Sequence, residues 1–103
     1  MRNDIMKIAD NYGLLRQTIK LCEEINELQR AANKAIIELA CDSKLSRTIT
    51  DNLVDELADV AIMVEQVAYL ADAVDAVKER VEFKVNRQLE RIAVEVNNER
   101  PDN

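Results

Sequence analysis

Histidine is absent from the 103-residue sequence, and glycine and proline occur once each. Without histidine there is neither a Ser-His or Cys-His nucleophile pair nor a histidine-ligated zinc site. Gly13 alone cannot build the glycine-rich loop of a P-loop or of a dinucleotide-binding motif. Any phosphate group would therefore have to be held by metal ions or by lysine and arginine side chains.

Cysteines and long apolar runs are also scarce. Cys22 and Cys41 are too few for a disulfide framework, which favours reduced thiols in a cytoplasmic protein. No apolar run approaches the roughly 20 residues of a membrane span, and Asp4 and Asp10 are not typical of a signal peptide. The net charge of −6 disfavours nucleic acid or an anionic membrane as the main partner.

What is present is a helical pattern. Hydrophobic residues make up 48% of the chain and charged residues 33%, which is typical of a globular protein. We expect one all-α domain over residues 1–97, followed by a disordered tail at 98–103. The spacing of apolar residues predicts a bundle of about four helices, at 3–10, 14–39, 52–71 and 74–97. Residues 41–50 are predicted as a loop, with Thr50 or Asp51 capping the next helix.

Three of these helices have a marked apolar face, and the helix at 52–71 and the last helix carry more apolar surface than one small chain can easily cover. The predicted apolar face of the helix at 14–39 comprises Leu14, Leu15, Ile19, Cys22, Ile25, Ala32 and Ile36. In the next helix only Glu65 and Gln66 are strongly polar between Val60 and Ala71, so we expect burial on nearly every side. The last helix has an apolar stripe of Val74, Val77, Val81, Val85, Leu89, Ile92 and Val96. We therefore expect a homodimer or a dimer of dimers.

Two groups of acidic residues stand out. Glu56 and Asp59 project from one side of their helix, about 60° apart, and Met63 follows between them one turn later. Carboxylates on such a face are costly unless a cation compensates them, and a divalent metal ion is the simplest partner. Glu23, Glu24 and Glu27 form the other group, and antiparallel packing would direct all five carboxylates into one volume. Each group taken alone fits an ordinary solvated face.

A row of basic residues lies beside the apolar stripe of the last helix. Its members follow one another at steps of four, three and four: Arg80, Lys84, Arg87 and Arg91. Two interpretations remain open. The row is either a solvated flank that pairs with neighbouring glutamates or a clamp for phosphate groups.

These residues resemble a known family, the MazG-like all-α nucleoside triphosphate pyrophosphohydrolases. "EEINE" at 23–27 looks like the EExxE motif of that family, and "ELAD" at 56–59 looks like its ExxD motif. "FKVNRQLERI" at 83–92 is similar to the basic last helix of small, phage-associated members. Phosphoribosyl-ATP pyrophosphohydrolases share the bundle, but "LCEEINEL" at 21–28 lacks the Gly-Glu-Glu-Ala pattern expected of them.

The resemblance implies an enzyme that hydrolyses a nucleoside or deoxynucleoside triphosphate to the monophosphate and pyrophosphate. The implied ligands of Mg²⁺, with Mn²⁺ as an alternative, are Glu23, Glu24, Glu27, Glu56 and Asp59. Glu24 is the implied general base, and Lys84, Arg87 and Arg91 the implied phosphate contacts. The preferred base is not readable from the sequence. The rival hypothesis is a non-catalytic scaffold or regulatory binding module of the same fold.

Overall fold

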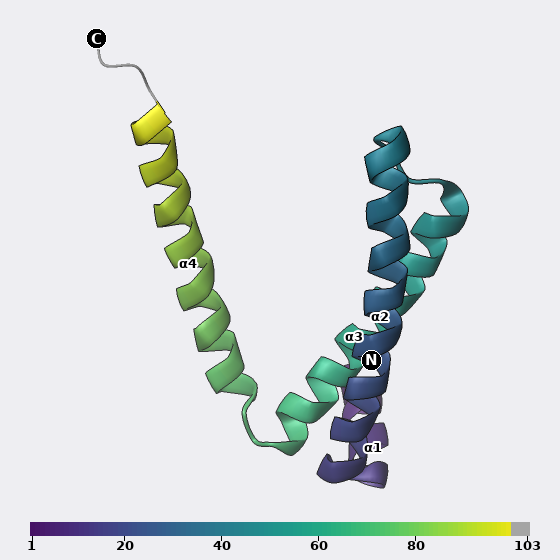
Figure 1. Cartoon of the computed structure of the whole chain (residues 1–103). Helices are drawn as coiled ribbons and strands as arrows, with labels where there is room; N and C mark the ends of the chain where they lie inside the picture. Colours follow the sequence, from purple (N-terminus) through teal and green to yellow (C-terminus); the bar gives the residue numbers. More distant parts are fainter. Residues whose placement is uncertain (100–103) are drawn as a thin grey trace. The chain divides into compact units, whose positions relative to one another are not determined.

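The computed structural model of the chain describes residues 1–99, and the regular structure in that range is entirely α-helical (Figure 1). Its helices are α1 (Arg2–Tyr12), α2 (Leu14–Asp42), α3 (Arg47–Leu70) and α4 (Val74–Glu99). The prediction of an all-α chain with about four helices is confirmed. None of these helices has a stretch of the length and apolarity needed to cross a membrane.

Residues 1–72 form one compact unit, and α4 belongs to a second unit that begins at Ala73. A single domain over 1–97 therefore stays a prediction. The predicted tail at 98–103 begins inside α4, which continues to Glu99, and residues 100–103 lie outside the described part of the chain.

In the first unit, α2 and α3 form an antiparallel hairpin joined by residues 43–46 (Figure 1). Ser43 ends α2 in the left-handed conformation, with φ 64°, and its N–H donates to the Leu39 carbonyl at 3.0 Å. Ser46 then caps α3, because its hydroxyl oxygen accepts from the Ile49 N–H at 3.3 Å. The Ser46 N–H donates to the Glu38 carboxylate, which ties the turn back to α2.

These contacts overturn the predicted loop at 41–50. α3 begins at Arg47 and has Ser46 as its cap, whereas the sequence favoured a start at 52 with Thr50 or Asp51 as cap. The error has a local cause: "SRTIT" at 46–50 is polar and lacks a long apolar period, but a serine cap suffices to start a helix that tertiary packing then holds.

The face of α2 that contacts α3 also differs from the predicted apolar face. The residues of α2 that are buried or partly buried recur mostly at steps of three and four: Gln17, Leu21, Glu24, Leu28, Ala31, Ala35 and Glu38, with Ala32 of the predicted face beside them. Ala31 and Ala35 are small enough to let the two helices approach closely, and both are buried. The bulky residues of the predicted face remain exposed, Leu15 at 78% and Ile36 at 62%.

Within one chain the third predicted helix is not buried on all sides, and its cover by a second chain stays a prediction. In α3 the buried residues are Met63 and Gln66, whereas Leu57, Ile62 and Val64 are exposed. The described part of α4 has no buried residue. Apolar composition had indicated a helix enclosed on all sides, but within the first unit only α2 and α1 pack against α3, and they leave part of its surface uncovered.

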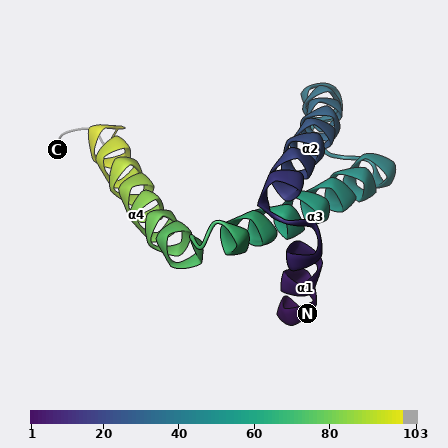
Figure 2. The same cartoon turned by 90° about the horizontal axis from the view of Figure 1, so that it is seen from below.

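Helix α1 completes the first unit by packing mainly against α3 (Figure 2). Gly13 connects α1 to α2 with φ 87°, a conformation that L-residues other than glycine rarely adopt. Ala9 is fully buried, and the Tyr69 hydroxyl donates to the Asp10 carboxylate at 2.9 Å. This hydrogen bond raises the pKa of Tyr69, with burial as a second cause. These contacts hold α1 against the C-terminal half of α3.

Candidate functional site

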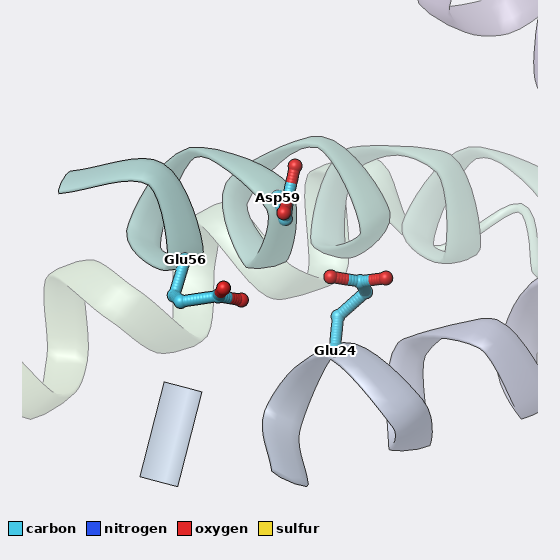
Figure 3. A group of neighbouring side chains, drawn as sticks. All are labelled: Glu24, Glu56 and Asp59. Atoms are coloured by element: carbon cyan, nitrogen blue, oxygen red, sulfur yellow. The ribbon is translucent and has the colours of Figure 1, made fainter. Parts of the chain in front are cut away.

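Three carboxylates meet between α2 and α3 (Figure 3). Glu24 comes from α2, and Glu56 and Asp59 come from α3; one oxygen of each lies within 4.8 Å of the other two. Glu24 and Glu56 occupy the seam between the helices because antiparallel packing brings their turns to the same level. An all-oxygen set of this kind suits a hard divalent cation such as Mg²⁺ or Ca²⁺.

Glu56 is the least compensated member of this carboxylate cluster. Its Oε2 atom is buried without a hydrogen-bond partner, the one such side-chain atom among residues 1–99. Burial raises the pKa of Glu56, and the negative charges of Asp59, Glu27, Glu24 and Asp55 raise it further. A buried oxygen without a donor is destabilising, and a cation held by the cluster would compensate it. The residues present therefore fit a divalent metal ion.

Lys20 is a functional candidate that the sequence analysis missed. Its Nζ lies 3.3 Å from Glu24 Oε1 and 3.6 Å from Glu23 Oε2, one turn earlier on α2. The hydrogen bond to Glu24 and the charges of Glu24 and Glu23 raise the pKa of Lys20. The signal was available, because a lysine four residues before a glutamate on a helix is placed to pair with it. Lys20 thus orients Glu24 and partly neutralises the cluster.

The other two predicted metal ligands lie close to the cluster but not in it. Glu23 and Glu27 are both exposed on α2, and neither belongs to the group of three. Glu23 pairs with Lys20, and Glu27 is near enough for its charge to raise the pKa of Glu56. The structure therefore brings Glu24, Glu56 and Asp59 together and leaves Glu23 and Glu27 at the edge.

The predicted phosphate contacts lie on α4, in the second unit. Lys84, Arg87 and Arg91 are all exposed. The Arg87 guanidinium carbon lies 5.7 Å from the centre of the Phe83 ring, a cation–π distance that holds the side chain along its helix. Their role toward phosphate groups stays a prediction.

A cavity of about 590 Å³ opens beside the cluster, within the first unit. Its walls come from all three helices of that unit, with Ile8 and Tyr12 from α1 and Ile62 and Met63 from α3. Lys20 and Glu23 also line it, so the cavity and the carboxylate cluster share the same turn of α2. Glu24, Glu56 and Asp59 do not line the cavity themselves; Lys20 links the two, because it lines the cavity and its Nζ lies 3.3 Å from Glu24 Oε1.

The sequence and the fold were also compared with known proteins. No family model, no curated protein and no solved structure matches the chain.

Proposed function

We propose that the chain is a metal-dependent nucleoside triphosphate pyrophosphohydrolase of the MazG-like type, which its two acidic motifs resemble. The observation that carries the proposal is the unpartnered Oε2 atom of Glu56 in a cluster of three carboxylates from two helices. A solvated acidic face offers no reason to bury such an atom, whereas a cation site does.

In this proposal Glu24, Glu56 and Asp59 hold Mg²⁺ or Mn²⁺, and Glu23 and Glu27 extend the site toward the triphosphate. When bound, the metal would neutralise phosphate charge and lower the pKa of a water molecule. Glu24 is the proposed general base, since it faces Glu56 and Asp59 from the opposite helix and Lys20 holds it in place. The products are a nucleoside monophosphate and pyrophosphate.

The basic row of α4 supplies the remaining charge in this proposal. Lys84, Arg87 and Arg91 neutralise the phosphate oxygens, and they do so in a homodimer or a dimer of dimers. The exposed apolar side chains of α2, α3 and α4 support assembly. The same exposure favours the alternative, a non-catalytic helical scaffold or binding module, because assembly alone requires no turnover.

An assay of pyrophosphate release across ribo- and deoxynucleoside triphosphates separates these two functions. Inorganic pyrophosphatase converts the product to phosphate for detection. We expect Mg²⁺-dependent release by the wild type and its loss in Glu56→Gln, which preserves shape and removes charge. Glu65→Gln, an exposed position on the same helix, is the matched control and should retain activity. The enzyme proposal fails if no triphosphate is hydrolysed, or if Glu56→Gln is as active as the wild type.

A further inference from the structure

The cavity beside the carboxylate cluster has two chemically different ends. Lys20 and Glu23 lie at the end next to the cluster, whereas the remaining walls are mostly apolar or aromatic. Tyr12 forms part of the wall, and the Arg16 guanidinium carbon lies 5.2 Å from the centre of its ring. This arrangement suits a ligand that has a flat, weakly polar ring at one end and strong negative charge at the other.

Two buried amides line the same cavity. Gln17 from α2 and Gln66 from α3 are 6% and 2% exposed, and Gln17 Nε2 donates to Gln66 Oε1 at 2.5 Å. This hydrogen bond uses one donor group and one acceptor. Hydrogen-bonding capacity remains on Gln17 Oε1, an acceptor, and on Gln66 Nε2, a donor. Because both glutamines line the cavity, we infer that this acceptor and this donor are available to a ligand there.

The amide pair lies two helical turns from the carboxylates on both helices. Gln17 and Glu24 are seven positions apart on α2, and Asp59 and Gln66 are seven positions apart on α3. Seven residues of α-helix rise about 10 Å. Because the helices are antiparallel, the two amides face each other at one level and the carboxylates at another. A nucleoside triphosphate can span such a gap, with its base at the amides and its phosphates at the cluster.

We propose that this cavity binds the nucleobase of the substrate and that Gln17 and Gln66 contact its Watson–Crick edge. This inference rests on the proposed function. Turning both amides by 180° exchanges the free donor and acceptor while it keeps one hydrogen bond between the glutamines. Cytosine and uracil differ by the same exchange of donor and acceptor along that edge. The amide pair therefore accepts either pyrimidine, and base selectivity between the two is low.

The test uses the full chain, labelled for NMR spectroscopy and titrated with cytidine or uridine in metal-free buffer. Both nucleosides should shift the side-chain amide signals of Gln17 and Gln66 and the methyl signals of Ile62. Gln66→Met, which keeps the volume and removes the polar group, should weaken nucleoside binding about fivefold or more. Gln29→Met, at an exposed position of α2, is the matched control and should bind as the wild type does.

Inorganic tripolyphosphate with Mg²⁺ provides the second probe. Its affinity should be the same in Gln66→Met as in the wild type, because it lacks a base. The inference is overturned if nucleosides leave the two amide signals in place, or if Gln66→Met binds them within twofold of the wild type. In that case the amide pair only sets the register of α2 and α3. Should Gln66→Met fail to fold, the proposal is tested by the wild type alone: it stands only if nucleosides shift the side-chain amide signals of Gln17 and Gln66.

The two proposals fail in different ways. A wild type that binds nucleosides at the amide pair but hydrolyses no triphosphate contradicts the enzymatic proposal and leaves the base cavity standing. A wild type that hydrolyses triphosphates while nucleosides shift neither Gln17 nor Gln66 removes the cavity assignment and leaves the enzyme.

Discussion

Burial and nearby negative charges both raise the pKa of the Glu56 carboxyl group, so the effect of pH on its contribution to stability has a definite direction. Its pKa in the folded state is raised above the usual 4.5, so the folded chain keeps this proton to a higher pH than the unfolded chain does. The stability that the proton contributes is complete below the unfolded pKa. It is lost as the pH rises through the folded pKa.

A pH series of melting temperatures in metal-free buffer tests this sign. We expect the wild type to lose stability relative to Glu56→Gln as the pH rises from below 4.5 toward neutrality, because only the wild type acquires a charge there. Melting by circular dichroism at each pH measures the difference. Two curves that remain parallel over this range would show that the Glu56 carboxylate is as well solvated in the folded chain as in the unfolded chain.

Metal binding at the same residues should offset the loss of stability that the ionised carboxylates cause in the folded state. A ligand that binds only the folded state adds RT ln(1 + [L]/Kd), about 2.7 kcal/mol at a hundredfold excess over Kd. For a domain of this size that is a rise on the order of 10 °C in melting temperature. We expect the rise in MgCl₂ but not in NaCl of equal ionic strength, and not in Glu27→Gln/Asp59→Asn. Equal shifts in both salts would mean that ionic screening alone acts on these carboxylates.

At the scale of the helices, the cap of α3 is the contact most open to a direct test. Ser46→Ala removes the acceptor for the Ile49 N–H and should lower the free energy of unfolding by about 1 kcal/mol. Asp51→Ala should have a small effect, since Asp51 lies inside α3 and its ion pair with Arg47 is exposed, at 4.0 Å. Urea denaturation of both variants compares them, and a larger loss in Asp51→Ala would move the start of α3 back toward residue 52.

Much of the helical content followed from the sequence, because a chain with one glycine and one proline offers few other structures. The pairing of Glu24 with Glu56 and Asp59 was also predictable, since helical spacing places each carboxylate and antiparallel packing does the rest. Which face of α2 meets α3 was not predictable. Periodicity identified the bulkiest stripe, whereas the actual seam contains small alanines and polar residues, among them Gln17, Glu24, Glu56 and Gln66.

Those polar residues explain why the pattern of apolar residues did not predict the contact face. A helix face that holds carboxylates and amides is predicted to be exposed to solvent when only apolar residues are counted, although in the folded chain it faces a neighbouring helix. Gln17 and Gln66 were assigned no role for this reason. Their pairing depends on the register of two segments far apart in the sequence, which local spacing does not determine.

For the whole molecule, the exposed apolar side chains predict assembly. Leu15 on α2 and Leu89 on α4 are more than half exposed, as are several of their apolar neighbours. We expect light scattering to give the mass of a homodimer or a dimer of dimers at micromolar concentration. Leu89→Glu should shift the mass toward that of a single chain. Gln88→Glu, which adds the same charge at an adjacent exposed position, should not.

A wild type with the mass of one chain would contradict this prediction. A Leu89→Glu variant with an unchanged mass would contradict the part of the prediction that places the apolar stripe of α4 in the interface. In the first case no assembly covers the exposed apolar side chains, and in the second the assembly does not depend on the stripe of α4.

The lack of buried side chains in the described part of α4 has a consequence for its amide hydrogens. Tertiary packing slows exchange with solvent, whereas a helix without it opens locally and exchanges early. The Ala31 and Ala35 amides, in the hairpin seam, should therefore exchange far more slowly than those of α4 in a dilute sample. If copies of the chain cover α4, its exchange should slow as protein concentration rises, while exchange in the hairpin changes little. Deuterium uptake of α4 would then measure association without any knowledge of the substrate.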